Sequence, residues 1–523
     1  MSELDGAIAV VGMAGRWPGA NEPARLWANL AAGERTIAST VEGVTDWDAE
    51  FFGISEEEAR IIDPQHRLLL ECAWEAMESA GHPPGTDSGV TSVFAGCSFP
   101  SYLVNNLATD PEVLAAHDEL ELVLANERDA LTSRLAYQLD LRGPSVTVQT
   151  FSSTSLVAVH LACQSLLTEE SDFALAGAAA IRVPLEPRPG ICRSFDAAAD
   201  GRVIGDGVAV VALKRLADAV ADGDHVWCVI RGTAVNNAGS ARPGYAAPGM
   251  AAQAEVMIEA LAAAELSAED VSYVEAHATG TPQGDAVELG ALERAYCPRE
   301  DTLLLGSCTA NLGHLEGASG VTGLIKVASM LHNAFLPPQI DFDTPSPALV
   351  AAPSLRVNTE ATKWTRGDGP LRAGVSSVGL GGVNAHVVLE EPPQRPVRSA
   401  EELAGPHLIL LSAKTPAALE EAAVRLRDHL VAEPEVELCD VAYTLQIGRN
   451  AFKCRRALLC TDRAHAIELL TTPGPAPDVA ESWLAGEAVD WRASHDGRTR
   501  LRVPLPTYPF QRRQCWVGPT EER

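Results

Sequence analysis

The stretch SVTVQTFSSTSLVAVHLACQSLL, residues 145–167, combines two periodicities. Its first part alternates apolar and polar side chains as a strand does, and its second part places Leu156, Val159 and Cys163 at helical spacing. The pattern predicts a strand that ends, and a helix that begins, near Ser152. The first N–H groups of a helix have no partner within the helix and lie at its positive dipole end. This junction therefore favours a nucleophilic side chain.

The same layout occurs a second time in the chain. LLLGSCTANLGHLEGASGVTGLIKVASML, residues 303–331, again reads as a strand, a turn of small polar residues and a helix rich in Ala, Gly and Val. Strand-like runs alternate with amphipathic helices from Ala7 to about Glu391, which predicts an α/β architecture. Two similar units indicate an internally duplicated fold with a site between its halves.

Two proline-rich segments, 392–406 and 471–477, indicate boundaries. We predict a first domain at 1–391, a linker with a small α/β subdomain at 392–470, and a tail at 471–523. The tail sequence RLRVPLPTYPFQRRQCWV is rich in proline and aromatic residues, so we expect an extended strap that packs back on the first domain.

Composition excludes several classes of function. The 523 residues carry 40 Lys and Arg against 70 Asp and Glu, a net charge of −30, which argues against nucleic acid as a partner. The 11 cysteines include no CxxC pair and no Cys/His cluster at metal spacing, so we expect free thiols, no metal and a cytoplasmic protein. The acidic N-terminus is unlike a signal peptide, and no apolar run reaches transmembrane length, so we expect no membrane contact.

Two histidines occupy equivalent loops. His277, in VSYVEAHATGTPQGD, follows a strand and precedes a helix expected from about Ala286. His314, in GSCTANLGHLEGASG, also lies between a strand and a helix. A single loop histidine is more often structural. Two of them, together with Ser152, predict one chemical site, because α/β folds place their chemistry in loops that follow strands.

A glycine-rich turn supplies the fourth element, in SSVGLGGVNAHVVLEE at 376–391. It lacks the GxxxxGK[ST] order of a phosphate-binding loop. It is either a tight bend between strands or, beside the Ser152 turn, a source of backbone N–H groups for half of an oxyanion hole.

The motifs DPQHRLLLECAWEAMESAG, GPSVTV, HATGTPQGD, NLGHLEGASGVTGLIK and GLGGVNAH resemble, in order and spacing, the β-ketoacyl synthase (ketosynthase) domains of modular polyketide synthases. The resemblance covers about residues 5–391. Residues 407–470 and the YPFQRR tail are similar to the flanking subdomain and post-acyltransferase linker of such synthases. The acyltransferase that usually separates these two is absent, which suggests a stand-alone, trans-acting enzyme. The resemblance implies a duplicated five-layer αβαβα thiolase-like fold and a homodimer.

The resemblance also implies roles for individual residues. Ser152 falls where the family has its cysteine nucleophile, and His277 and His314 fall on its two catalytic histidines. The N–H groups of Ser152 and Leu380 would form the oxyanion hole. The substrate would arrive on the phosphopantetheine arm of an acyl carrier protein, with no bound cofactor. The other positions expected to contact the arm or the acyl chain are Thr279, Thr281, Thr309, Phe151, Val378, Gly381 and Gly382.

Several positions depart from the family pattern. Thr309 stands where the family has its active-site lysine, and we interpret Lys326, in the following helix, as structural. Val378 and Val383 replace the usual Phe and Thr, and the chain looks short near Thr40 and near Pro189.

Loss of the lysine weakens the decarboxylative Claisen cycle. A β-keto thioester needs no decarboxylation, because a neutral histidine can deprotonate its acidic α-carbon when an oxyanion hole stabilises the enolate. The same site is therefore suited to an intramolecular aldol cyclisation, after which the new alkoxide attacks the enzyme-bound ester and releases a lactone.

The serine at 152 has two interpretations. A native serine predicts a crippled acyl acceptor, because its alkoxide is costly to form and its ester is a poor acyl donor. We favour replacement of a native cysteine, because both histidines and the oxyanion turn are retained.

The alternatives are chain extension with malonyl-carrier protein and a degenerate, non-catalytic scaffold protein. A serine hydrolase is disfavoured because the GxSxG elbow is missing, and a degradative thiolase would need a second catalytic cysteine.

Overall fold

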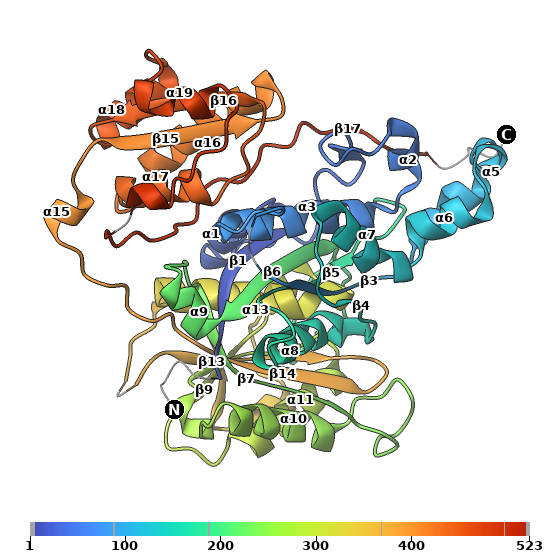
Figure 1. Cartoon of the computed structure of the whole chain (residues 1–523). Helices are drawn as coiled ribbons and strands as arrows, with labels where there is room; N and C mark the ends of the chain where they lie inside the picture. The colour runs from blue at the N-terminus through green and yellow to red at the C-terminus, as the bar shows by residue number, and fades with distance from the viewer. Residues whose placement is uncertain (1–5, 87–88, 187–188, 368, 496, 519–523) are drawn as a thin grey trace.

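The computed structural model describes residues 6–86, 89–186, 189–367, 369–495 and 497–518. The first domain is built on a mixed sheet with the strand order β11-β9-β8-β13-β14-β7-β1-β6-β5-β3-β4 (Figure 1). These strands are β1 (Ile8–Arg16), β3 (Thr91–Cys97), β4 (Ser145–Thr147), β5 (Phe173–Ala180), β6 (Gly207–Arg215), β7 (Cys228–Asn237), β8 (Tyr273–Glu275), β9 (Leu303–Gly306), β11 (Leu355–Val357), β13 (Arg372–Val378) and β14 (Val383–Glu390).

The sheet consists of two halves with the same topology. In the order β4-β3-β5-β6-β1 the first three strands are parallel and the last two pair antiparallel. The order β9-β8-β13-β14-β7 repeats this pattern strand for strand. A short antiparallel pairing of β1 with β7 joins the halves, and β11 extends the second half beside β9. The predicted duplication is confirmed.

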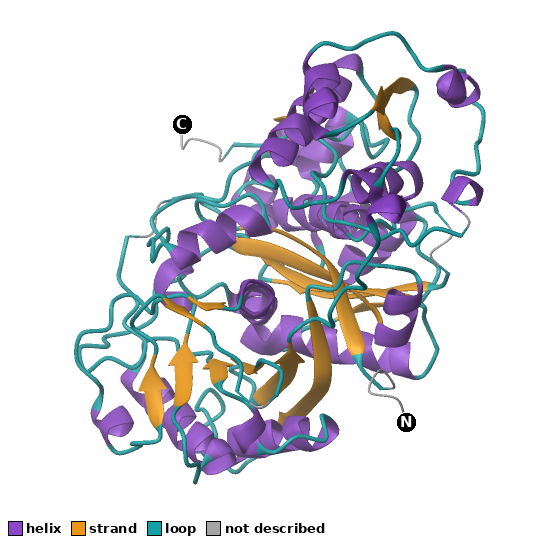
Figure 2. Ribbon diagram, turned by 90° about the vertical axis from the view of Figure 1, so that its left-hand side faces the viewer, coloured by secondary structure: helices purple, strands orange, loops and turns teal. Residues whose placement is uncertain are grey.

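Helices form the remaining layers. The equivalent helices α8 (Thr154–Leu167) and α13 (Ser319–Asn333) follow β4 and β9, contact each other and lie between the two halves of the sheet (Figure 2). Outside, α3 (Pro64–Ser79) covers β1 and β6, while α10 (Met250–Ala263) covers β7 and β14 and packs on α11 (Pro282–Tyr296). Because α13 is enclosed, every residue from 320 to 331 is buried, as expected of a helix that is largely apolar on all sides.

Two predicted boundaries were wrong. Strand β4 ends at Thr147 rather than near Ser152, because the chain bends into a 3-10 turn, η2 (Phe151–Ser153), before α8 begins. The helix after His277 begins at Pro282 rather than near Ala286. Proline is favoured in the first helical turn, where its missing N–H has no intrahelical partner to lose.

The second unit contains one antiparallel pair, β15 (His407–Ala413) with β16 (Cys454–Cys460). The helices α16 (Pro416–Ala432), α17 (Leu438–Ile447) and α18 (Arg463–Thr471) pack against it, and α15 (Ala400–Leu403) lies in the preceding linker. Figure 1 shows this unit beside the first domain, in orange and red.

The last described residues return to the first domain as an extended segment. Strand β17 (Arg513–Gln514) pairs antiparallel with β2 (Asp46–Trp47). Buried polar groups of α3 meet the same segment: the Arg67 guanidinium donates to the Cys515 carbonyl, and Glu78 accepts from the Tyr508 N–H at 2.7 Å. The segment 500–517, called the strap below, thus lies across α3.

Candidate active site

The turn between β4 and α8 presents Ser152 through a left-handed residue. Phe151 has φ of +58°, a conformation that costs a bulky residue energy and is found at functional turns. It places Ser152, which is 5% exposed, directly before the first turn of α8, while the Phe151 ring stays 54% exposed. The Ser377 hydroxyl donates to the Ser152 carbonyl at 2.7 Å and holds the turn against β13.

His314 is in hydrogen-bond contact with this serine. Its Nε2 lies 2.9 Å from Ser152 Oγ, and its Nδ1 lies 3.2 Å from Ser319 Oγ at the start of α13. The His314 backbone is fixed on both sides, because its N–H donates to the Val203 carbonyl and its carbonyl accepts from the Gly205 N–H. The duplicated fold therefore brings the first turns of α8 and α13 to one point.

His277 completes the group. Its ring centroid lies 5.1 Å from that of His314, with the planes at 84°. The backbone N–H groups of His277 and Ala278 each donate, at 2.8 Å, to one oxygen of the Glu288 carboxyl on α11. Sequence reasoning missed Glu288, although an acidic residue on the helix just after the histidine loop was a usable signal. It also missed Ser319, which lies only five residues after its partner His314, and Ser377, whose contact with Ser152 is long-range.

Burial makes both histidines neutral. Burial, with a smaller contribution from the charge of Arg202, lowers the pKa of His277 to about 4. Burial, followed by the neighbouring His277 and two arginines, moves the pKa of His314 well below its usual range. A neutral imidazole has one donor and one acceptor nitrogen. His314 Nε2 accepts from Ser152 when Nδ1 carries the proton and donates to Ser319, and this tautomer can act as a base.

The glycine turn lies directly against the serine turn. A Cβ at Gly379 would meet the Thr150 carbonyl at 2.3 Å, so only glycine allows this approach. The Gly382 N–H donates to the Gly379 carbonyl at 2.9 Å and closes a β-turn with Leu380 and Gly381 at its centre. Within the described part of the chain the Leu380 N–H donates to no protein acceptor. It is therefore available to a ligand beside Phe151.

Position 309 supplies no charge. Thr309 is buried, and its hydroxyl donates weakly to the His277 carbonyl at 3.4 Å. Lys326 Nζ lies 2.6 Å from a Glu275 oxygen that also accepts from the Tyr273 hydroxyl at 2.7 Å. This buried pairing with Glu275 occupies the Lys326 charge and fits the structural interpretation of that lysine.

The remaining predicted positions lie around this centre. The Thr279 and Thr281 hydroxyls are 2.9 Å apart at the entrance to α11. Val378 ends β13 and is half-buried, and a Cβ at Gly381 would lie 3.5 Å from the Phe151 ring. Within the described ranges no group of His, Cys, Asp and Glu side chains is arranged to hold a metal. No helix in these ranges is long and apolar enough to cross a membrane.

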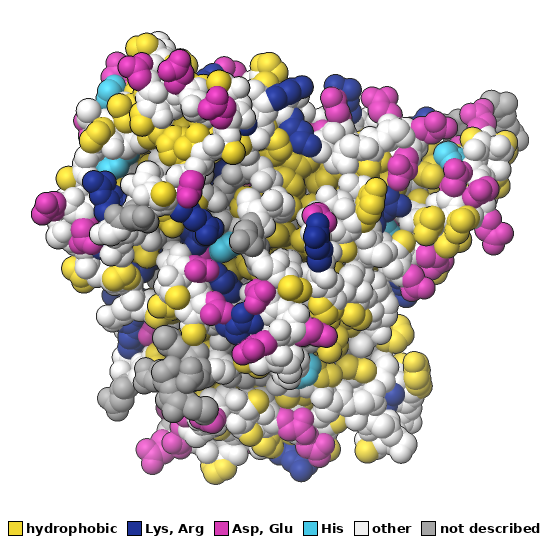
Figure 3. Space-filling view, viewed as in Figure 1, with side chains coloured by type: hydrophobic (Ala, Val, Ile, Leu, Met, Phe, Trp, Pro, Cys, Tyr) yellow, Lys and Arg dark blue, Asp and Glu magenta, His cyan; other side chains and the backbone are white. Residues whose placement is uncertain are grey.

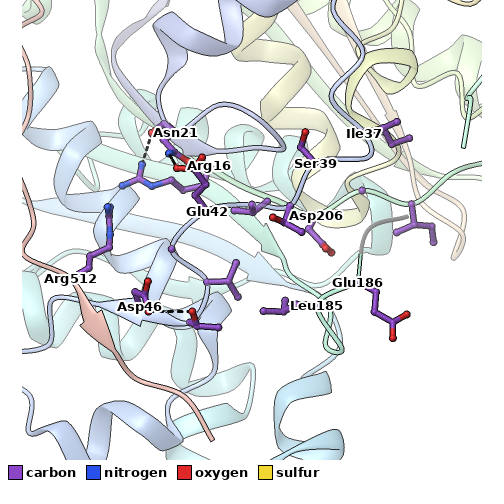
Figure 4. A pocket seen from close by; sticks show the side chains of 17 residues that line it. Arg16, Asn21, Ile37, Ser39, Glu42, Asp46, Leu185, Glu186, Asp206 and Arg512 are labelled. Atoms are coloured by element: carbon purple, nitrogen blue, oxygen red, sulfur yellow. Dashed lines mark hydrogen bonds between the residues drawn. The ribbon is translucent and has the colours of Figure 1, made fainter. Parts of the chain in front are cut away.

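A cavity of about 690 Å³ opens next to the site but does not include it (Figure 4). Its lining contains Ile37, the segment 39–46 and Arg512, and none of Ser152, His277 or His314. It adjoins the site through Ile204, which forms a β-bridge with His314, and through Gly205, which donates to the His314 carbonyl.

Family comparisons agree with this geometry. The β-ketoacyl synthase N-terminal domain matches residues 5–42 and 34–219, and its C-terminal domain matches residues 227–343. The break in the first match falls around Thr40, where the chain looks short. A polyketide synthase C-terminal family described as CurL-like matches residues 407–470.

Curated relatives are large synthases. One component of the phenolphthiocerol/phthiocerol polyketide synthase of Mycobacterium tuberculosis is 43% identical over 520 residues, which cover 90% of this chain and 35% of the relative. A second component of the same synthase is 40% identical over 504 residues, covering 88% of this chain and 32% of the relative. The chain thus spans about a third of the length of these relatives.

Solved structures cover nearly the whole chain. Ketosynthase twelve of the bacillaene polyketide synthase from Bacillus amyloliquefaciens is 31% identical with a TM-score of 0.89, covering 98% of this chain and 100% of that one. The module 6 ketosynthase of the Bacillus subtilis bacillaene synthase, solved as a cysteine-to-serine mutant, is 30% identical with a TM-score of 0.87, covering 98% of this chain and 100% of that one. The thiolase-like fold is confirmed, and the chain belongs to the β-ketoacyl synthase family as a ketosynthase-type polyketide synthase domain.

Proposed function

We propose that the protein takes an acyl chain from a carrier-protein thioester onto residue 152 and forms a carbon–carbon bond by intramolecular aldol cyclisation, with lactonising release. In this proposal Ser152 replaces a native cysteine. The observation that carries it is the contact of Ser152 Oγ with His314 Nε2 at 2.9 Å, beside a second neutral histidine and with threonine instead of lysine at 309.

The proposed acylation uses the contact between Ser152 and His314. The nucleophile attacks the thioester carbonyl while its proton moves to His314 Nε2. The N–H groups of residues 152 and Leu380 bind the tetrahedral oxyanion. The intermediate then expels the pantetheine thiolate, which takes the proton back from His314. We assign the Thr279 and Thr281 hydroxyls to the pantetheine arm, because they lie together at the entrance to α11.

Cyclisation uses the same groups. A neutral histidine removes the acidic proton between the two carbonyls, and the N–H pair stabilises the enolate oxygen. The enolate carbon attacks a carbonyl further along the chain and leaves an alkoxide. The alkoxide attacks the ester or thioester at residue 152, closes a lactone and expels the side chain, which regains its proton from the histidine. The low pKa values keep both imidazoles unprotonated, and no cationic lysine is needed.

The product class is supported by resemblance. Two histidines without the lysine are similar to the pattern of the ketosynthase that builds the γ-lactam-β-lactone of salinosporamide, which motivates a lactone product. The acyltransferase missing between residue 470 and the strap supports loading from an acyl carrier protein in trans.

A homodimer is part of the proposal. Strand β4 is the edge of the sheet. Around it, α6 (Glu119–Asn126), α7 (Asp129–Leu139) and the neighbouring turns expose hydrophobic side chains, and Figure 3 shows such side chains over α6. These are Phe99, Leu120, Leu124, Tyr137, Val146 and Phe151. An unpaired strand edge beside exposed apolar side chains favours pairing with a second copy.

The test compares the protein with its Ser152→Cys variant. Each is incubated with a β-ketoacyl pantetheine thioester that carries an internal carbonyl, and intact-protein mass spectrometry follows the adduct. We expect the cysteine form to gain the acyl mass and then lose it as a cyclic product. The serine form should acylate at least about 100-fold more slowly, because a hydroxyl is the weaker nucleophile. Absence of any adduct on the cysteine form contradicts the proposal and favours a non-catalytic scaffold.

Decarboxylative Claisen extension is the second candidate. It is favoured by the adjacent rings of His277 and His314, which could both contact the thioester carbonyl of malonyl-carrier protein. Release of carbon dioxide from malonyl-carrier protein by the acylated cysteine form would support it. Ring formation without such release would exclude it.

A further inference from the structure

An arginine donates to the glycine turn 379–382 from outside, beside a longer contact from Asn237 Nδ2 to the Gly381 carbonyl at 3.5 Å. The segment 238–249, between β7 and α10, lies over the turn and contains Arg242. Arg242 Nη1 donates to the Leu380 carbonyl at 3.2 Å, and Nη2 donates to the Gly381 carbonyl at 2.9 Å. The Arg242 Nε–H donates to the Gly239 carbonyl, within the segment 238–249, at 3.1 Å. The guanidinium therefore bridges two segments that are distant in sequence.

The turn needs such a support. Gly381 and Gly382 lack side chains that restrict rotation, and Gly382 already has φ of +85°. The peptide between Leu380 and Gly381 is the centre of the turn, and its carbonyl is the group that Arg242 Nη1 holds. Rotation of this peptide changes the orientation of the adjoining peptide, which carries the Leu380 N–H. The Ala238 N–H fixes the far end by donating to the Gly382 carbonyl at 2.9 Å.

The charge of Arg242 is directed at these carbonyls. Among the described residues no carboxylate lies within ion-pair distance of Arg242. Its guanidinium lies 5.5 Å from the Tyr245 ring, which is 74% exposed. Hydrogen bonds from a charged donor are stronger than neutral ones, and a planar guanidinium holds two neighbouring carbonyls in a way that a lysine ammonium does not reproduce.

We propose that Arg242 is a positioning residue, which holds the turn so that the Leu380 N–H stays aimed at the reacting carbonyl. This inference rests on the proposed function, in which Leu380 supplies half of the oxyanion hole. Arg242 itself touches neither the substrate nor the reacting atoms.

The experiment uses the Ser152→Cys protein as its background and adds Arg242→Ala, Arg242→Lys or, as a charge-matched control, Arg356→Ala. Arg356 is exposed on strand β11, in the outer part of the sheet. We expect Arg242→Ala to lower the maximal acylation rate by about 10-fold or more, a fraction of the loss from deleting an oxyanion donor. Arg242→Lys should be intermediate and Arg356→Ala unchanged. The substrate concentration for half-maximal rate should stay the same.

Hydrogen–deuterium exchange of the peptide covering 376–391 is the second readout. Exchange should accelerate in Arg242→Ala and not in Arg356→Ala. Equal acylation rates in Arg242→Ala and the background overturn the inference, as does a change confined to the half-maximal concentration, which would mean substrate binding. Should Arg242→Ala not fold, Arg242→Lys decides. If the background itself forms no acyl adduct, the proposed function fails, while the exchange data still decide whether Arg242 holds the turn.

Discussion

The active site and the strap interface are both buried and polar, yet they handle charge in opposite ways. In the site, Ser152, His277 and His314 are neutral and are held through hydrogen bonds that mostly involve the backbone. Under the strap, the carboxylates of Asp224 and Glu71 each contact more than one cationic side chain. The contrast teaches that neutral groups lie where the proposed mechanism moves protons, and that paired charges lie where two distant segments of the chain pack together.

Asp224 and Glu288 show the difference in single residues. Asp224 lies 2.8 Å from His82, 2.9 Å from Lys214 and 2.7 Å from Arg502 of the strap, and these partners lower its pKa to about 2 despite burial. The Glu288 carboxyl accepts hydrogen bonds from two backbone N–H groups and has no cationic partner among the described residues. Burial therefore raises its pKa to about 7. A buried carboxyl is thus charged where cations surround it and close to neutral where they do not.

The largest effect is expected in the site. In the Ser152→Cys protein, His314→Ala should slow acylation by about 100- to 10,000-fold, because the general base is lost. His465→Ala, in the flanking subdomain, is the control and should have no effect. The rate of adduct formation by mass spectrometry measures both. A loss below a few-fold would mean that the 2.9 Å contact with Ser152 has no catalytic role.

Asp224→Asn should cause the next largest loss, now in stability. It leaves Arg502 buried without a countercharge and leaves Lys214 with Asp222 as its only remaining carboxylate partner among the described residues, which costs roughly 3–5 kcal/mol of unfolding free energy. The matched control is Asp218→Asn, whose partner Arg215 is partly exposed and whose loss should stay below about 1 kcal/mol. Urea titrations measure both, and equal losses would show that burial of the pair does not matter.

The raised pKa of Glu288 predicts that its contribution to the free energy of unfolding changes with pH in the opposite direction to that of Asp224. Its pKa is higher in the folded protein, about 7, than the ordinary value of 4.5, so the folded state binds more protons between these values. The contribution of Glu288 to stability is full below about pH 4.5 and is lost as pH rises to about 7, by roughly 3 kcal/mol.

The test of this pH dependence is the difference in unfolding free energy between the protein and Glu288→Gln across that range. The neighbouring carboxyls Asp285 and Glu275 are present in both proteins. A change of this difference with pH therefore reports the titration of Glu288. A difference that is constant with pH would contradict the raised pKa.

The smallest effect is expected on the exposed side of the strap. Arg513 is 70% exposed at its side chain and lies 3.5 Å from Glu56 and 3.8 Å from Glu50. Arg513→Ala should therefore cost less than about 1 kcal/mol of unfolding free energy in a urea titration. A loss as large as that of Asp224→Asn would mean that the whole strap, rather than its buried pairs, secures the interface.

Much of the site was predictable because local chain geometry encodes it. The two strand–turn–helix units predicted the duplication, and with it the approach of Ser152 to His314, because equivalent strands end at equivalent points of the sheet. Glu288, Ser319, Ser377 and Arg242 were not predicted as supports of the site. Ser377 and Arg242 contact segments 225 and 138 residues away, and such residues carry no local sign of these contacts. Glu288 and Ser319 lie within 11 residues of their partners, but their contacts depend on how each histidine loop folds back onto the helix that follows it.

By itself the sequence determined which segments form strands and helices and where the turns require glycine, since these depend on neighbouring residues. It also determined the chemical types of the nucleophile and of the two imidazoles. Tertiary structure alone decided that the imidazoles are neutral, that Lys326 is paired with Glu275, and that Arg242 donates to two carbonyls of the glycine turn. Protonation and orientation depend on burial and on distant partners, and a linear sequence contains neither until the chain has folded.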